Sequence, residues 1–135
     1  MSEMTAYEAI GGKDVIRGTI DLFYENLLGD IETVPPVSRH FENLSTSRLE
    51  TVRERTGTVV GRLLGAPGEP PVDMVRLARV HARLDITLQD FDVTIGHLVR
   101  AFQILPEGEV AVAALGQYVE PLRGMLVTMP QGRTL

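Results

Sequence analysis

The chain has 135 residues, enough for one domain (residues 1–135), and 44% of them are hydrophobic, which suffices for a core. It contains no cysteine, so disulfides, thiolate metal ligands and cysteine nucleophiles are excluded. The formal charge of −5 argues against nucleic-acid binding, which needs a basic face. No apolar run is long enough to span a membrane, and the first residues lack a signal-peptide pattern. A cytoplasmic protein is therefore expected.

The first long helix is predicted over residues 14–28, because apolar residues recur there at helical spacing. This stripe consists of Ile16, Ile20, Phe23 and Leu27. Tyr24 borders the stripe, so its ring is expected to point inward and its hydroxyl to need a partner. Upstream, residues 7–10 can form about one helical turn before the pair Gly11-Gly12, which permits positive φ and a sharp change of direction.

Residues 30–43 show no helical period and predict a loop, since Pro35-Pro36 prevents a helix across it. This loop carries His40 and Phe41. Residues 66–72 contain three prolines and predict a second loop.

Between the two loops, a helix is predicted to begin with a capping box formed by Ser47 and Glu50, and to stop at Gly65. Thr56 is the polar residue on the apolar face of this helix. The other residues of that face are Leu49, Val52, Val59, Val60 and Leu63.

Two helices are predicted within residues 75–102. In the first, Leu77, Ala78 and Leu84 lie three or four positions from His81, a spacing that turns the imidazole toward the core. The second begins with a capping box of Thr87 and Asp90. Its apolar stripe consists of Phe91, Ile95, Leu98, Val99 and Phe102, and Ile86 is placed to pack on Phe91 as a hydrophobic staple.

A last helix is predicted over residues 107–126, with a kink at Pro121. No segment sustains the alternation of a strand, so the fold class is all-α. Tyr24, Thr56 and His81 are polar residues on three otherwise apolar helix faces, which fits a buried pocket with a few fixed polar groups. Taken alone, however, His81 is better read as a core histidine bonded to a backbone carbonyl, because buried histidines are more often structural than ligands.

Several short motifs resemble, in their order, those of truncated haemoglobins, and most closely group I. They are Gly11-Gly12, Leu22-Phe23-Tyr24, Leu64-Gly65-Ala66-Pro67, His81 followed by Ile86 and Phe91, Gly96-His97-Leu98, and Glu120-Pro121-Leu122. The resemblance implies a truncated-globin-like fold, a two-on-two helical sandwich that encloses haem b. It leaves open whether the protein is a monomer or a homodimer.

On the proximal side of the haem, the resemblance assigns His81 as the ligand of the iron through Nε2, with its other nitrogen on a backbone carbonyl. Ile86 and Phe91 are expected to pack on the porphyrin. His97 is expected to be structural. His40 is either an exposed loop residue, the residue against the porphyrin in place of Phe41, or a second iron ligand.

On the distal side, the resemblance places the hydroxyl of Tyr24 toward the bound gas, with Thr56 in support. Val52 faces the same pocket, and Phe41 falls near the position of a phenylalanine that wedges against the porphyrin. Arg55 stands where relatives place a basic residue for a haem propionate, although it is equally well read as a solvated helix charge.

The resemblance therefore implies binding of dioxygen, nitric oxide or carbon monoxide, for oxygen handling or for converting nitric oxide to nitrate. The latter role also needs an electron-donating reductase. An alternative is a haem enzyme, peroxidase-like or biosynthetic, whose pocket is widened at Val59 and Val60 for a small organic substrate. A third class is an interaction module that has kept the fold without the haem.

Overall fold

The computed structural model describes residues 4–30, 36–84 and 86–128. Within these residues the chain is built from helices and contains no strand, so the all-α prediction is confirmed. The elements are α1 (Ala6–Ala9), α2 (Lys13–Leu28), the 3-10 helix η1 (Val37–Phe41), α3 (Thr46–Leu63), α4 (Met74–Arg83), α5 (Leu88–Gln103) and α6 (Gly108–Thr128). None of the helices so described is long and apolar enough to cross a membrane.

The short first helix is defined by a capping box that the sequence analysis missed. Thr5 accepts a hydrogen bond from the backbone of Glu8, whose carboxylate reaches back to Thr5. The helix then ends at the glycine pair, where Gly11 and Gly12 take φ angles of +113° and +79°, as predicted. A Cβ at Gly11 would also lie 2.6 Å from Cγ2 of Val15, so no other residue fits this turn.

The predicted start of α3 is wrong by two residues. The N-cap is Ser45, whose hydroxyl accepts a hydrogen bond from the backbone N–H of Arg48 at 3.2 Å. Ser47 instead lies in the first turn of the helix. Two serines two positions apart offer the same cap chemistry, and the earlier one lengthens the helix by about half a turn. At the other end, Gly65 follows the C-cap with φ +97°, as a helix stop requires.

The predicted loop over residues 30–43 contains a short helix, η1, that the absence of a period had hidden. Pro36 is extended, with φ −69° and ψ 141°, and serves as the N-cap of η1. Val37 is only 3% exposed and anchors the segment in the core. A five-residue helix with one buried residue produces no periodic pattern, which is why the sequence did not reveal it.

Other boundaries follow the prediction closely. Asp73 caps α4 by accepting from the backbone N–H of Arg76, and the Thr87–Asp90 capping box opens α5 as predicted. Pro121 lies inside α6, which continues past it to Thr128. The kink at Pro121 stays a prediction.

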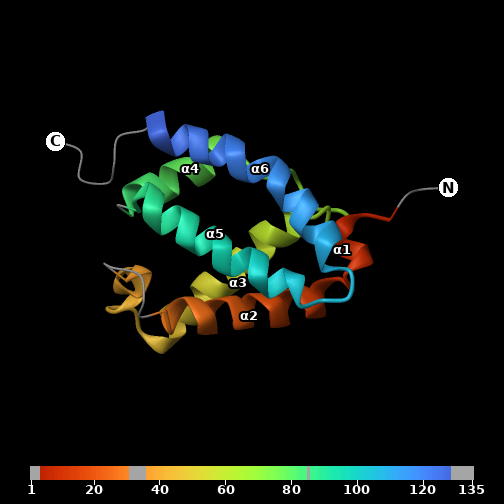
Figure 1. Ribbon diagram of the computed structural model, residues 1–135, viewed down its shortest axis with the longest axis horizontal. Helices are drawn as coiled ribbons and strands as arrows, with labels where there is room; N and C mark the ends of the chain where they lie inside the picture. Colours follow the sequence, from red (N-terminus) through yellow and green to blue (C-terminus); the bar gives the residue numbers. More distant parts are fainter. Residues whose placement is uncertain (1–3, 31–35, 85, 129–135) are drawn as a thin grey trace.

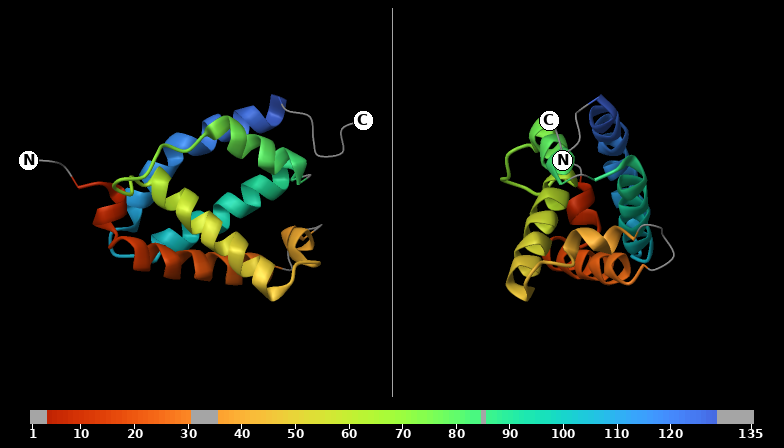
Figure 2. Two further views of the ribbon diagram at one scale, coloured as in Figure 1. Left: turned by 180° about the vertical axis from the view of Figure 1, so that it is seen from behind. Right: turned by 90° about the vertical axis from the view of Figure 1, so that its left-hand side faces the viewer.

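The helices form two layers that meet at one end of the molecule (Figure 1). α2 packs on α3 and on α5, and α5 packs on α6. α4 packs mainly on α6 and lies at the edge of the molecule, on the same side as α3 (Figure 2). α3 and α4 make no extensive contact with each other.

Candidate functional site

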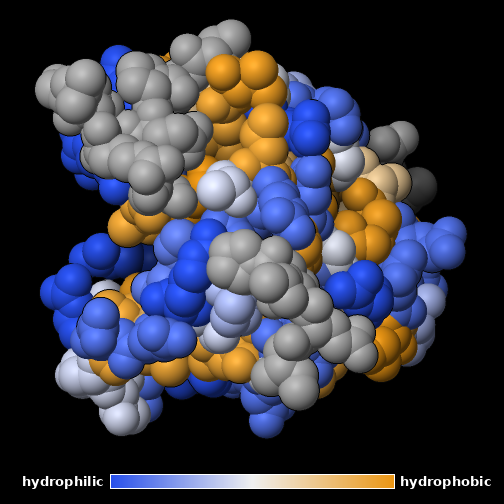
Figure 3. All heavy atoms as spheres, turned by 60° about the vertical axis from the view of Figure 1, so that its left-hand side comes forward, coloured by the Kyte–Doolittle hydropathy of each residue, from blue (hydrophilic) through white to orange (hydrophobic). Residues whose placement is uncertain are grey.

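The apolar core is divided into two clusters. The first includes Tyr24 and has the half-buried Phe41 and Val52 packed against it. The second is built by α4, the start of α5 and the C-terminal half of α6; it includes Phe91, with Ile86 packed against it. The surface on this side of the molecule is notched, with hydrophobic atoms at the edge of the notch (Figure 3). Tyr24, Phe41 and Val52, predicted to be distal, thus belong to the first cluster, and Ile86 and Phe91, predicted to be proximal, belong to the second.

His81 projects from the inner face of α4, beside the fully buried Ala78. Its Nδ1 lies 2.8 Å from the carbonyl oxygen of Leu77, one turn earlier. Because a carbonyl only accepts, Nδ1 carries a proton, and in the neutral imidazole Nε2 then has the lone pair. Among the described residues nothing bonds to Nε2. An imidazole held in this tautomer has the donor atom that a metal ion requires.

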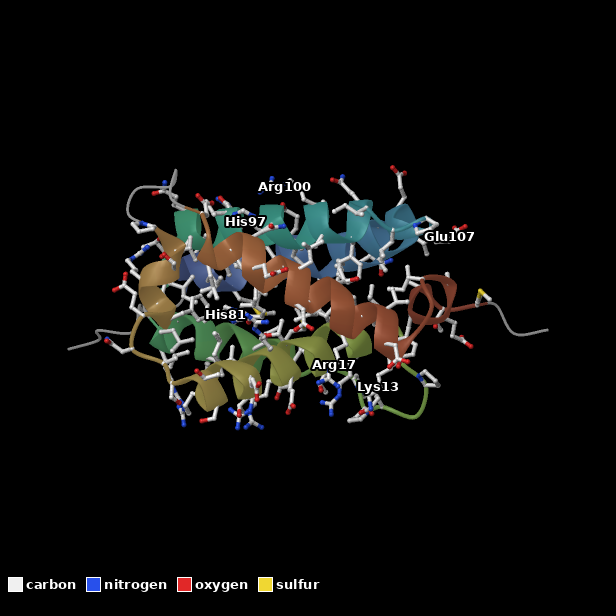
Figure 4. All side chains as sticks on the ribbon, turned by 90° about the horizontal axis from the view of Figure 1, so that it is seen from below. Lys13, Arg17, His81, His97, Arg100 and Glu107 are labelled. Carbon is white, nitrogen blue, oxygen red and sulfur yellow. The ribbon has the colours of Figure 1, made fainter. Side chains whose placement is uncertain are left out.

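The other two histidines use Nε2 differently. Nε2 of His40 lies 3.0 Å from Oδ2 of Asp90, and Nε2 of His97 lies 2.8 Å from Oδ2 of Asp30. His81 is therefore the one histidine whose Nε2 has no carboxylate partner in the part of the chain that the structure describes. His97 lies with Arg100 on the opposite side of the molecule from His81 (Figure 4).

Two hydroxyl groups form a hydrogen-bonded chain among the residues predicted to be distal. The hydroxyls of Tyr24 and Thr56 are 2.8 Å apart, and Thr56 donates to the carbonyl oxygen of Val52 at 2.9 Å. Since a threonine has a single O–H, this arrangement makes Tyr24 the donor to Thr56. The phenol is only 5% exposed, so the predicted inward direction and the predicted need for a partner are both met.

The Tyr24 ring is fixed by its neighbours. Phe23 and Phe41 meet it edge-on, with ring centroids 4.8 Å and 5.9 Å away. The guanidinium of Arg53 lies 5.7 Å from the Tyr24 ring centroid, in cation–π range. Burial raises the pKa of the Tyr24 hydroxyl above its ordinary value, and the Thr56 bond and the Arg53 charge offset this only in part. The phenol therefore keeps its proton at neutral pH and acts as a hydrogen-bond donor.

A buried cluster around Asp90 ties η1 to the start of α5. Arg39 binds both carboxylate oxygens, at 3.0 and 2.6 Å, and His40 and the backbone N–H of Thr87 add further bonds. Asp90 is 2% exposed; burial alone would raise the pKa of its carboxyl group, but these bonds outweigh it and lower the pKa to about 2. Phe41, next to this cluster in the chain, lies edge-on against Tyr24, and Nε2 of His40 is occupied by the bond to Asp90.

The sequence analysis identified Asp90 only as a helix-capping residue. Its further partner Arg39 comes from the segment predicted to be a loop. Only one signal in the sequence could have suggested this link. It is the combination of a capping carboxylate, Asp90, at the start of a core helix and a cationic residue, Arg39, in a segment without a predicted helix.

A shallow surface cavity of about 560 Å³ lies beside His97. It is lined by Asn26, His97, Arg100, Gln103 and Ile104. Nδ1 of His97 accepts a bond of 3.3 Å from Arg100, so both ring nitrogens are engaged. His97 thus connects α5 to the end of α2, which agrees with the predicted structural role, although it lies at the surface rather than in the core.

A protein-family model described as bacterial-like globin matches residues 5–127. The chain belongs to the bacterial-like globin family. No curated protein matches the sequence. Membership in a truncated globin family implies a haem cofactor and haem-based binding of a diatomic ligand, with oxygen binding among its functions.

The residues of this globin fit a haem on the observations above. The free Nε2 of His81 is a suitable donor for iron. Each of the two apolar clusters has half-buried side chains packed against it, which a flat porphyrin could contact. In contrast, the described residues contain no group of three or more histidine, aspartate or glutamate side chains that could hold a free metal ion. Arg55 is exposed on α3 and forms no ion pair with any described residue.

Proposed function

We propose that this globin binds haem b through Nε2 of His81 and uses it to bind dioxygen or a related diatomic gas, for oxygen binding or nitric oxide detoxification. The observation that carries this proposal is the hydrogen bond from Nδ1 of His81 to the Leu77 carbonyl, which leaves Nε2 free on the inner face of α4. The same bond orients the ring and raises its basicity as a ligand. We further propose that the protein is closest to group I of the truncated globins and is cytoplasmic.

When bound, haem supplies an iron with one open coordination position for the gas. The protein supplies the surroundings of that position. We assign Phe41 and Val52 to the distal wall, and Ile86 and Phe91 to the proximal wall, because the first pair packs on one apolar cluster and the second pair belongs to or packs on the other. Arg55 is available to a haem propionate, since its side chain is exposed and has no other charge partner among the described residues.

Tyr24 is assigned as the donor to the gas ligand. To serve it, the Tyr24 proton must turn away from Thr56. Thr56 can compensate by turning its own proton from the Val52 carbonyl to the Tyr24 oxygen, because that carbonyl lies inside α3 and already accepts a helical bond. The exchange leaves no donor unpaired, so a ligand bond of about 1–3 kcal/mol is gained at little cost.

The test is a titration of the purified protein with hemin, followed by absorption spectra of the ferric, ferrous and carbonyl forms. We expect saturation at one haem per chain and a ferrous spectrum typical of a single histidine ligand. A protein that stays colourless with excess hemin contradicts the proposal and favours a haem-free interaction module. A spectral change on adding a small organic substrate would favour the haem enzyme.

A further inference from the structure

The outer face of α4 combines cationic and apolar side chains in one continuous surface. At 100° per residue, Arg76, Arg79 and Arg83 fall within a sector of about 60°, opposite His81. Large aliphatic residues flank them on both sides. We call this set the α4 outer face: Val75, Arg76, Arg79, Val80, Arg83 and Leu84, all of them exposed.

The aliphatic members of this face are unusually open for their size. Val75, Val80 and Leu84 are 46%, 43% and 57% exposed, although the same helix buries Ala78 and Ala82 completely or nearly so. Apolar side chains that rim a row of arginines are typical of a protein-binding surface, where arginine and aliphatic contacts are combined.

The charge of this face differs from that of the whole chain. Residues 74–83 contain three arginines and no acidic residue, whereas the chain carries a net charge of −5. Among the described residues, none of these three arginine side chains forms an ion pair. Elsewhere in the structure Arg123 pairs with Asp92 and Arg62 with Glu69. The three arginines of the α4 outer face therefore have no ion-pair partner among the described residues, on an acidic protein whose Asp73 and Asp85 border this helix in the sequence.

We propose that the α4 outer face docks an acidic electron-donor protein. This inference rests on the proposed haem function and names the surface through which the iron is reduced. The argument is charge complementarity: three arginines select an acidic partner and raise its association rate, and the aliphatic rim is buried on contact. Because α4 carries His81 on its inner face, a docked partner lies about one helix diameter, ~10–12 Å, from that face.

An anionic membrane fits the surface less well. A membrane meets a broad face of the protein, and the remaining chain is acidic enough to be repelled by it. A partner protein can contact α4 alone, which lies at the edge of the molecule (Figure 2).

The experiment uses reduced flavodoxin, a small acidic one-electron carrier, as the probe and follows reduction of the haem-loaded globin by stopped flow. The test variant is Arg76→Gln/Arg79→Gln/Arg83→Gln. The matched control is Lys13→Gln/Arg17→Gln/Arg48→Gln, which removes the same charge from exposed residues of α2 and α3. Lys13 and Arg17 lie far along the molecule from α4 (Figure 4).

At low ionic strength we expect the second-order rate constant to fall about tenfold or more in the α4 variant and less than about threefold in the control. The difference should shrink as salt is added. Reduction by dithionite, which needs no docking, should be the same in all three proteins. Equal rate constants for the α4 variant and the control overturn the proposal.

Binding of labelled flavodoxin to the haem-free protein, measured by fluorescence anisotropy, separates this proposal from the haem assignment. If the chain binds no haem but still binds flavodoxin through α4, the haem function fails and the docking surface stands. Two results assign the face to another occupant and overturn the proposal. One is binding of wild type, but not the α4 variant, to phosphatidylglycerol vesicles. The other is a dimer in sedimentation that the α4 substitutions abolish.

Discussion

The region around His81 and the regions around the other two histidines differ in which nitrogen of the imidazole ring is hydrogen-bonded. His40 and His97 each direct Nε2 at a carboxylate and thereby connect one segment to another. His81 directs Nδ1 at a carbonyl of its own helix and leaves Nε2 without a partner among the described residues. The first arrangement uses histidine to link two segments, and the second leaves a ring nitrogen free for the proposed role as an iron ligand.

The difference shows that burial alone does not separate a structural histidine from a metal ligand. All three side chains are partly covered, and all three are hydrogen-bonded. What differs is which nitrogen is bonded and to what, since that determines whether a lone pair is available.

His81→Gly should abolish stable haem binding, or make it depend on added imidazole, because the variant lacks the only available nitrogen ligand. Hemin titration with and without imidazole measures this directly. His97→Gln is the matched control, and its haem spectrum should be unchanged. Loss of haem in His97→Gln with retention in His81→Gly would reverse the comparison.

Asp90→Asn should destabilise the fold by about 2–3 kcal/mol, because it leaves Arg39 and His40 without their buried charge partner. The native carboxyl group has a pKa of about 2, below its ordinary value of 3.8, so it stabilises the folded state above about pH 4. That contribution disappears as the pH falls from about 4 to about 2.

Urea unfolding of the wild type and Asp90→Asn from pH 7 to pH 2 measures both effects. The stability gap between the two proteins should narrow in the acid range. A gap that is constant with pH would mean that the Asp90 carboxylate is not a source of stability.

Tyr24→Phe keeps the ring but removes the donor, so oxygen should dissociate about ten to a hundred times faster. Carbon monoxide, less polar when bound, should be affected much less. Thr56→Val should have a smaller effect in the same direction, because Tyr24 then lacks the hydroxyl that orients it. Stopped-flow release of both gases measures these changes. Equal oxygen release from the wild type and Tyr24→Phe would mean that Tyr24 keeps its bond to Thr56 when the gas binds.

His97→Gln should cost about 1 kcal/mol of unfolding free energy, through the lost bond to Asp30. Asp30→Asn is the matched partner variant, and the two substitutions together should cost less than the sum of the two single losses. Additive losses would show that His97 and Asp30 act independently.

His40→Ala should leave the ferrous spectrum five-coordinate, as in the wild type, since His40 is held by Asp90 and the distal residues Val52 and Thr56 are not iron ligands. A six-coordinate wild-type spectrum that disappears in His40→Ala would instead make His40 a second ligand.

Much of the fold could be predicted because its signals are local. The glycine pair, the Thr87–Asp90 capping box and the stripe around Tyr24 each depend on residues within a few positions of one another, and each is confirmed. The start of α3 and the helix η1 were missed, since a competing serine and a single buried valine leave no periodic trace.

The residues of the candidate site could be predicted from the sequence, but the hydrogen bonds between them could not. Helical spacing predicts that Tyr24 and Thr56 point inward. It cannot predict the hydrogen bond between them, because the two residues are 32 positions apart in the chain. The bond between Arg39 and Asp90 spans 51 residues for the same reason. Long-range pairs of polar side chains depend on how helices pack, which local pattern does not determine.

The central claim is that His81 alone supplies the iron ligand, and the double variant His40→Gln/His97→Gln tests it most directly, because His81 is then the only histidine in the chain. Circular dichroism first establishes that the variant is folded, and hemin titration and the ferrous spectrum follow. We predict one haem per chain and a wild-type, five-coordinate ferrous spectrum. A folded variant that fails to bind haem, or whose ferrous spectrum lacks a histidine ligand, would contradict the assignment.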